Sequence, residues 1–216
     1  MKLITMSRYS KEHKKDAAYK QAKREGYRAR SAFKLQDIQN RYNIFKRAYY
    51  ILDLGSAPGS WLQVAKKYAE VNLTKYLDKH YHRDHYKIMG IDIKKITPIE
   101  NIKILQMDFT IPEFLNEVNE YFEGEKLDLI LSDASINKSG NKFNDQLRQT
   151  KLCFKILDLI TSLKIDGNLV VKIFQGTDFN DFYLKMKGNF LTVKSLKPKS
   201  SNKKSNEIYL IGLKKK

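Results

Sequence analysis

Hydrophobic runs alternate with amphipathic stretches along most of the chain. Short apolar runs rich in β-branched and aromatic residues predict buried strands, and stretches with apolar residues at every third or fourth position predict helices. The expected strands cover residues 49–54, 87–93, 102–106, 127–132, 168–174, 190–196 and 207–213. The expected helices cover residues 11–25, 31–42, 61–69, 112–122, 145–163 and 178–186. This alternation is typical of an α/β protein.

The order of these elements predicts a mostly parallel sheet with helices on both faces. The last two strands have no helix between them, so we expect an antiparallel pair at one edge. The sequence has no internal repeat and no linker-like stretch. We therefore expect residues 1–216 to form a single domain, with a basic helical segment at about 1–45 and a basic strand pair at about 190–216.

Positive charge is concentrated at the two ends of the chain. The 216 residues carry a formal net charge of +17. Residues 1–34 hold 11 Lys and Arg against 3 Asp and Glu, and residues 194–216 hold 8 against 1. If the two ends meet in space, they form a surface for a polyanion, and nucleic acid is the partner that we expect. The alternative is a pair of solvated lysine-rich tails, which the helical and strand patterns of the two ends disfavour.

Several classes of protein and site are excluded by composition. No run approaches the roughly 18 apolar residues of a membrane helix, and the start does not resemble a signal peptide. We expect no membrane partner and an intracellular location, in the cytoplasm, nucleus or an organelle. The single cysteine, Cys153, excludes an internal disulfide and a thiolate-rich metal site, and it is expected in the core. His80, His82 and His85 lack an accompanying carboxylate pattern, so we expect no metal there but a solvated loop or an RNA contact.

The strongest local motif is a glycine-containing turn between the first buried strand and the next helix, with the sequence DLGSAPGSW at 53–61. Gly55 and Gly59 let the backbone turn sharply and approach a ligand closely. The motif lacks the spacing of a dinucleotide fingerprint and the lysine of a P-loop. It therefore favours a nucleoside-like ligand without a pyrophosphate, the alternative being an ordinary strand–turn–helix corner.

Polar residues follow or interrupt the strands on either side of this turn. Asp92, Asp108 and Asp133 each stand at or just beyond the end of a strand, where they could bind ribose hydroxyls or an adenine amine, or simply cap a loop. Lys172 lies inside an apolar strand, where burial is costly unless the amine is paired or neutral. It is either a proton acceptor or a lysine that extends to solvent at a strand end. Glu207 is a candidate partner for Lys172.

At this point the sequence resembles the FtsJ (RrmJ-type) family of RNA 2′-O-ribose methyltransferases. Ordered motifs from about residue 15 to the end carry the resemblance: GYRARSAFKL at 26–35, DLGSAPGSW at 53–61, LSD at 131–133, VVKIFQG at 170–176, and the KP…SS…SNEIY pattern at 197–209. One departure concerns the loop after Asp133. The family usually shows Ala-Pro-Asn there, whereas this chain has Ser135-Ile136-Asn137, which changes the expected shape of the loop.

The resemblance implies an S-adenosylmethionine-dependent methyltransferase with a Rossmann-like fold: a mostly parallel seven-stranded sheet, one antiparallel edge strand, and helices on both faces. It places a catalytic tetrad on Lys34, Asp133, Lys172 and Glu207. It places the cofactor positions on Gly59, Trp61, Asp92, Asp108 and Asp133, to which the turn itself adds Gly55. Of the tetrad residues, Lys34 is singled out by the resemblance alone.

The resemblance also implies a substrate, a uridine of large-subunit ribosomal RNA, and we expect the protein to act as a monomer. Lys172 is our hypothesis for the acceptor of the ribose proton, with Lys34 as a nearby cation and the two carboxylates orienting both amines. Three alternatives stay open. They are a tRNA anticodon-loop ribose methyltransferase, a non-catalytic RNA-binding or ribosome-assembly protein on the same fold, and a methyltransferase for a protein or small molecule.

Overall fold

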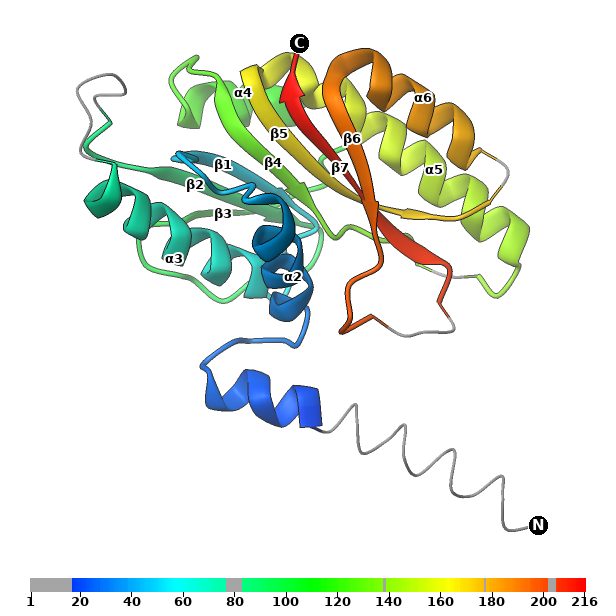
Figure 1. The fold of residues 1–216 in the computed structure, drawn as a ribbon, viewed down its shortest axis with the longest axis horizontal. Coiled ribbons are helices and arrows are strands. Elements are labelled where there is room, and N and C mark those ends of the chain that lie inside the picture. Colours follow the sequence, from blue (N-terminus) through cyan, green and yellow to red (C-terminus); the bar gives the residue numbers. More distant parts are fainter. Residues whose placement is uncertain (1–16, 77–82, 138, 177, 202–204) are drawn as a thin grey trace.

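The computed structural model describes residues 17–76, 83–137, 139–176, 178–201 and 205–216. Its centre is a seven-stranded sheet in the order β3-β2-β1-β4-β5-β7-β6 (Figure 1). The strands are β1 (Tyr50–Leu54), β2 (Lys87–Asp92), β3 (Lys103–Gln106), β4 (Leu127–Ser132), β5 (Leu163–Phe174), β6 (Phe190–Leu196) and β7 (Glu207–Lys215). The helices are α2 (Ala32–Tyr42), α3 (Ser60–Lys75), α4 (Glu113–Tyr121), α5 (Lys142–Asp158), η1 (Leu159–Ser162) and α6 (Phe179–Asn189).

The mostly parallel α/β sheet is confirmed. Strands β1 to β5 pair in parallel, and β7 is antiparallel to both β5 and β6. The reversed strand β7 is therefore second from the edge, and β6 is outermost. This arrangement brings the start of β7 against the end of β5.

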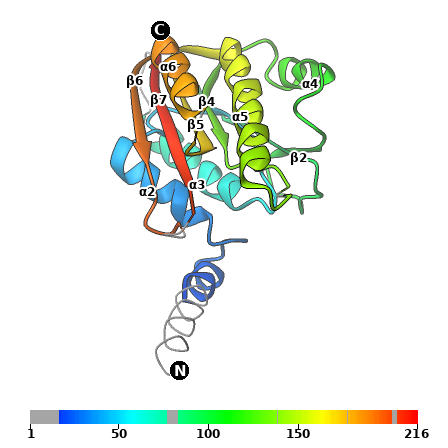
Figure 2. The same ribbon diagram turned by 90° about the vertical axis from the view of Figure 1, so that its right-hand side faces the viewer.

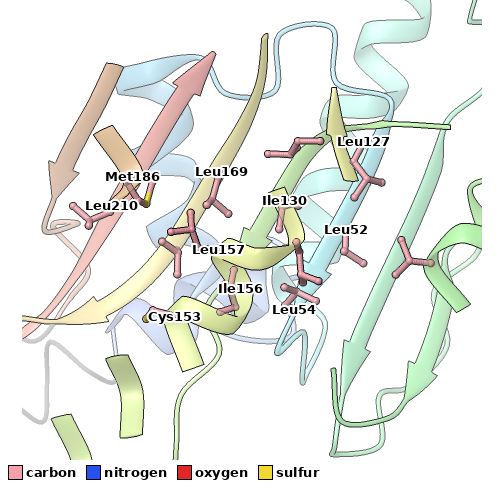
Figure 3. Packing of buried hydrophobic residues seen from close by; sticks show 14 of the residues in the cluster. Leu52, Leu54, Leu127, Ile130, Cys153, Ile156, Leu157, Leu169, Met186 and Leu210 are labelled. Carbon is pink, nitrogen blue, oxygen red and sulfur yellow. The ribbon is translucent and has the colours of Figure 1, made fainter. Parts of the chain in front are cut away.

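Helices cover both faces of the sheet (Figure 2). One apolar cluster joins α4, α5 and α6 to the sheet, and Figure 3 shows Cys153, Ile156 and Leu157 of α5 packed near Leu52 and Ile130. The other cluster joins α2 and α3 to the opposite face. Cys153 is fully buried, as expected, and burial raises the pKa of its thiol to about 12.

Most expected elements are present, with shifted ends. Helix α5 begins at Lys142 because the Asn141 side chain caps it, accepting from the N–H groups of residues 143 and 144. Strand β5 begins five residues earlier than predicted, at Leu163, because its first half carries polar residues that hide the strand pattern. The first expected helix is helical over residues 17–24, and its residues 11–16 lie outside the described chain. In the described chain no helix is long and apolar enough to cross a membrane.

The described parts of the two basic ends pack against each other. Apolar residues of α2 (Ala32, Leu35) share one core cluster with Leu196 of β6 and Ile211 of β7. The backbone N–H of Lys199, in the β6–β7 loop, also donates to the Asp37 carboxylate at 2.8 Å. The helix 17–24 and the β6–β7 loop consequently lie on the same side of the molecule in both views (Figures 1 and 2).

Candidate active site

A cleft of about 400 Å³ opens where the strand order reverses, between the carboxyl ends of β1 and β4. Ligands of open α/β sheets bind at this switch point. The two strands pair up to their last residues, Leu54 and Ser132. The following loops therefore start side by side. The structure brings four of the predicted cofactor residues to the lining of this cleft: Gly55, Asp92, Asp108 and Asp133.

Gly55 is required by the close approach of these two loops. Its φ is +74°, and a Cβ at this position would lie 2.6 Å from the Cα of Ala134. Any larger residue would push the β4 loop away and change the width of the cleft. The turn after β1 is thus built to pack directly against the residue that follows Asp133.

Gly59 and Trp61 do not line the cleft. Gly59 has a φ of +104° and forms the N-cap of α3. The Trp61 side chain packs against Tyr209, and its indole N–H donates to the carbonyl of Ser31 at 2.9 Å. Both residues lie at the helix start, where backbone N–H groups lack helical partners. A cofactor role for Gly59 and Trp61 stays a prediction.

The predicted ribose and adenine acceptors also hold the loops in place. Asp92 accepts from the backbone N–H groups of Ala57 (2.9 Å) and Lys94 (2.8 Å). One oxygen of Asp108 accepts from both the backbone N–H and the hydroxyl of Thr110. Each carboxylate oxygen can accept more than one hydrogen bond. Asp92 and Asp108 can therefore stabilise their loops and bind a ligand at the same time.

Four charged side chains from distant parts of the sequence meet beside the cleft: Lys34, Asp133, Lys172 and Glu207. Lys172 Nζ lies 3.0 Å from Asp133 Oδ1 and donates to the Asp133 carbonyl at 2.5 Å. Lys34 Nζ lies 4.0 Å from a carboxylate oxygen of Asp133 and 4.0 Å from one of Glu207. The Lys172 side chain is 7% exposed, and those of Lys34 and Glu207 are 17% and 22% exposed. Lys172 is thus the most buried of the four, because the Asp133 side chain is 19% exposed.

Strand β7 supplies two of the residues at this site. Its antiparallel register places Tyr209 opposite Lys172 and Glu207 opposite Phe174. Glu207 forms its ion pair with Lys34. A pairing of Glu207 with Lys172 stays a prediction.

Tyr209 is a site residue that the sequence analysis missed. Its hydroxyl donates to Asp133 Oδ1 at 2.5 Å and accepts from Lys34 Nζ at 3.2 Å. The residue is fully buried, and burial together with the charge of Asp133 raises its pKa well above the usual range. Tyr209 consequently keeps its proton and donates. One signal was available, since residues two apart in a strand share a face and Tyr209 follows Glu207 by two.

Asp53, the first residue of the glycine-containing motif, lies beneath the cleft. It is buried, and neither carboxylate oxygen has a hydrogen-bond partner among the described residues. The neighbouring Ser56 hydroxyl donates to the backbone carbonyl of Asp53 instead, at 2.6 Å. Burial raises the pKa of Asp53 well above its usual range, and the negative charges of Asp133 and Asp92 add to the effect.

The second helix starts differently from the expectation. Ser31 occupies its N-cap position, but its side chain makes no capping bond. The Ser31 hydroxyl lies 2.8 Å from that of Ser60, the first residue of α3. This contact ties α2, and with it Lys34, to the turn that borders the cleft.

Of the three histidines in the basic stretch, the structure describes His85, whereas His80 and His82 lie outside the described residues. His85 lies 3.0 Å from the hydroxyl of Tyr50 and 2.8 Å from Asp84. The described chain holds no group of three His, Cys, Asp or Glu side chains placed to share a metal ion.

Comparisons with known proteins agree with this geometry. The family model described as FtsJ-like methyltransferase matches residues 27–215. The chain is 38% identical over 93% of its length, and 69% of the relative's, to ribosomal RNA large subunit methyltransferase E of Methanosarcina acetivorans. It is 37% identical to the protein of that name from Acinetobacter baylyi, over 98% of this chain and 93% of the relative.

Two solved structures resemble the fold. A ribosomal RNA methyltransferase from Plasmodium falciparum superposes with a TM-score of 0.73 and 31% identity, covering 88% of this chain and 98% of that one. A methyltransferase from Streptococcus mutans, solved with SAH, superposes with a TM-score of 0.50 over 83% of this chain and 97% of that one. At 12% identity the second similarity concerns the fold alone.

Proposed function

This chain belongs to the FtsJ-like methyltransferase family, and from that premise we propose that it transfers the methyl group of S-adenosylmethionine to the 2′-hydroxyl of a uridine in large-subunit ribosomal RNA. The observation that carries the proposal is the meeting of two lysines and two carboxylates at the edge of a nucleoside-sized cleft. Asp133 belongs to both, because it lines the cleft and bonds Lys172.

The residues of the cleft fit S-adenosylmethionine. Asp92 and Asp108 offer acceptors for ribose hydroxyls and an adenine amine, and Ile136 and Leu152 offer apolar surface for a purine. The carboxylates of Asp92, Asp108 and Asp133 give the cleft negative charge to match a cationic cofactor. The cofactor supplies an electrophilic methyl group on a positively charged sulfur. The chain has to supply position, proton transfer and exclusion of water.

A ribose 2′-hydroxyl is a weak nucleophile, so the chain must hold it in line and accept its proton. We assign proton acceptance to Lys172 Nζ, which must be neutral at that moment and which Asp133 orients from 3.0 Å. Lys34 holds the hydroxyl oxygen from the open side, and Glu207 orients Lys34 from 4.0 Å. Tyr209 keeps Lys34 and Asp133 together through its shared hydroxyl.

The basic ends support an RNA substrate. Lys20, Lys23 and Arg24 are exposed on the helix 17–24, on the same side of the molecule as the β6–β7 loop with Lys197 and Lys199. That loop leads directly into Glu207, so the cations flank the tetrad. Contacts to phosphates position an RNA without reading its sequence, and they make affinity fall with salt. We expect one domain, acting as a monomer, to bind a ribosomal RNA or particle in this way.

The test is transfer of labelled methyl from S-adenosylmethionine to a panel of unmodified RNAs: free large-subunit ribosomal RNA, assembled large subunits and tRNA. We expect label in the ribosomal RNA, free or assembled, and none when Lys172 is replaced by alanine. Label confined to tRNA would instead assign the chain to the tRNA alternative. RNA binding without label on any RNA would contradict methyl transfer to RNA, and turnover indifferent to RNA would indicate a protein or small-molecule substrate.

A further inference from the structure

Gln149 of α5 is a fully buried amide whose hydrogen-bonding groups all meet backbone. Its Oε1 accepts from the N–H of Ile136 at 3.1 Å. Its Nε2 donates to the carbonyl of Ala134 at 3.1 Å and to that of Lys172 at 3.2 Å. A primary amide has two N–H donors and one carbonyl acceptor. The site offers two backbone carbonyls to the donors and one backbone N–H to the acceptor.

These backbone groups lie just beyond the end of the β4–β5 ladder. The two strands pair up to Ser132 and Val171, so Asp133 and Lys172 are the first residues past the last pair. Buried backbone groups at such a point need partners from elsewhere. Gln149 provides them on both strands at once. It thereby links the loop after Asp133 to the backbone of Lys172, whose amine contacts that same aspartate.

The loop that Gln149 holds forms one wall of the cofactor cleft. Ala134 and Ile136 line the cleft. Ala134 is confined on its other side by Gly55, where an added Cβ would lie 2.6 Å from its Cα. The loop is therefore fixed between the turn after β1 and the amide of Gln149. A displacement of either support would change both the cleft and the position of Asp133.

Ile136 explains why an amide is needed at this point. A proline at position 136 would lack an N–H and would restrict its own φ. An isoleucine keeps the N–H, and the wall of the cleft then requires an acceptor for it. Gln149 Oε1 is that acceptor.

We propose that Gln149 is a positioning residue for methyl transfer. It fixes the wall formed by residues 134–136, against which the cofactor binds. It also holds Asp133 at the position where it contacts the Lys172 amine. This inference rests on the proposed function for its catalytic half. Its binding half concerns S-adenosylmethionine alone and can be measured without RNA.

The experiment starts with Gln149→Met, which conserves side-chain volume and removes the three hydrogen bonds to backbone as well as the weaker one to Cys153 Sγ. We expect S-adenosylmethionine to bind about tenfold more weakly by calorimetry, because the wall loses its support. We also expect kcat for RNA methylation to fall severalfold. Should the methionine variant fail to fold, Gln149→Leu serves the same purpose.

Cys153→Ala is the matched control. Cys153 is fully buried one turn further along the same helix, and its thiol donates to the same Lys172 carbonyl at 3.2 Å. Its sulfur also accepts from Gln149 Nε2 at 3.9 Å, so the control removes this weak contact and leaves the bonds of Gln149 to backbone in place. In the described chain it has no hydrogen bond to residues 134–136. We expect this variant to keep wild-type cofactor affinity at temperatures below its Tm, even if it is less stable.

A second substitution that restores cofactor binding distinguishes positioning of the loop 134–136 from a general contribution of Gln149 to protein stability. Ile136→Pro removes the N–H that Gln149 satisfies and stiffens the loop. We expect Gln149→Met with Ile136→Pro to bind S-adenosylmethionine more tightly than Gln149→Met alone. Wild-type affinity in Gln149→Met, an equal loss in Cys153→Ala, or no recovery in the double variant would each overturn the proposal. If the wild-type protein binds S-adenosylmethionine but methylates no RNA, the proposed function fails while these affinities still decide the role of Gln149.

Discussion

On the β1–β3 side of the cleft, each predicted cofactor residue stands at the end of a strand or in the turn that follows it. Gly55 follows β1, Asp92 ends β2, and Asp108 comes two residues after β3. Parallel strands bring their carboxyl ends to one edge, so these residues converge because of topology alone. The Asp92 carboxylate also holds its own loop through Lys94 and joins it to the turn after β1 through Ala57.

On the opposite side, the tetrad draws on four segments that are far apart in the sequence. Lys34 comes from α2, Asp133 from the β4 loop, Lys172 from within β5, and Glu207 from the start of β7. They meet because β7 inserts between β5 and β6 and because α2 packs on that part of the sheet. The cofactor side is thus built locally, whereas the tetrad depends on long-range packing. We therefore expect mutations on the tetrad side to lower kcat and mutations on the cofactor side to lower the affinity for S-adenosylmethionine.

The largest effect should come from Lys172→Ala. We expect kcat to fall by about 10³-fold or more, because the 2′-hydroxyl loses its proton acceptor. Affinity for S-adenosylmethionine should change less than about threefold, since Lys172 is not among the residues that line the cleft. Single-turnover methyl transfer and calorimetry measure the two quantities. The exposed Lys187 of α6, replaced by alanine, is the control, and a Lys172→Ala variant that loses cofactor binding would break the distinction between the two sides.

Asp92→Asn should give the reverse pattern. We expect S-adenosylmethionine to bind about 10–100-fold more weakly, because the amide cannot accept on both sides as the carboxylate does. At saturating cofactor, kcat should return to near the wild-type value. A full titration of rate against cofactor concentration tests this, with Asp181→Asn, an exposed change in the first turn of α6, as the control. A lower kcat that cofactor does not restore would count against the assignment.

Tyr209→Phe removes the hydroxyl shared by Asp133 and Lys34 while keeping the buried ring. We expect kcat to fall by about tenfold and KM for the cofactor to stay unchanged. The pKa of Tyr209 is raised, so the wild-type rate should show no loss from its ionisation as the pH rises to about 10. Tyr183→Phe, a partly buried tyrosine of α6, is the matched control. Full activity in Tyr209→Phe would mean that Lys34 and Asp133 hold their positions without it.

Asp53→Asn should have the smallest effect, on stability. The pKa of Asp53 is raised on folding, so its contribution to stability is complete below the unfolded pKa of about 4 and is lost as the pH rises toward the folded pKa. We therefore expect the cofactor-free variant to be more stable than the wild type at pH 7. The difference should vanish near pH 4. Urea unfolding across this pH range tests it, with the exposed Asp158→Asn as the control, and a variant that is less stable at pH 7 would refute the sign.

The local nature of the cofactor side explains why it could be predicted from the sequence. Strand ends can be placed from periodicity, and a polar residue after each of three strands then lies at one edge by topology. Of the tetrad residues on the other side, Lys34 could not be reached in this way. Nothing in the pattern around Lys34 shows that α2 packs beside β7, and the family resemblance alone singled it out.

The residues that the sequence did not reveal are those whose role depends on contact rather than type. In the sequence, Tyr209 is one of several aromatic residues in predicted strands. Its role becomes visible only from the hydrogen bond that its hydroxyl donates to Asp133 at 2.5 Å. In the sequence, Gln149 is a polar residue on an amphipathic helix, whereas in the structure it is fully buried. The side chain of Trp61 packs toward Tyr209 rather than into the cleft. These differences follow from packing, which periodicity does not specify.

The central claim, methylation at a ribose oxygen, is tested most directly by locating the transferred methyl group. Alkaline hydrolysis cleaves RNA through attack by the 2′-hydroxyl on the adjacent phosphodiester, and a 2′-O-methyl group blocks that attack. We predict that large-subunit ribosomal RNA treated with the wild-type protein and S-adenosylmethionine shows one protected position, at a uridine, in the hydrolysis ladder. RNA treated with Lys172→Ala should show an uninterrupted ladder. Incorporated label with an uninterrupted ladder in the wild-type reaction would place the methyl group on a base and contradict the account.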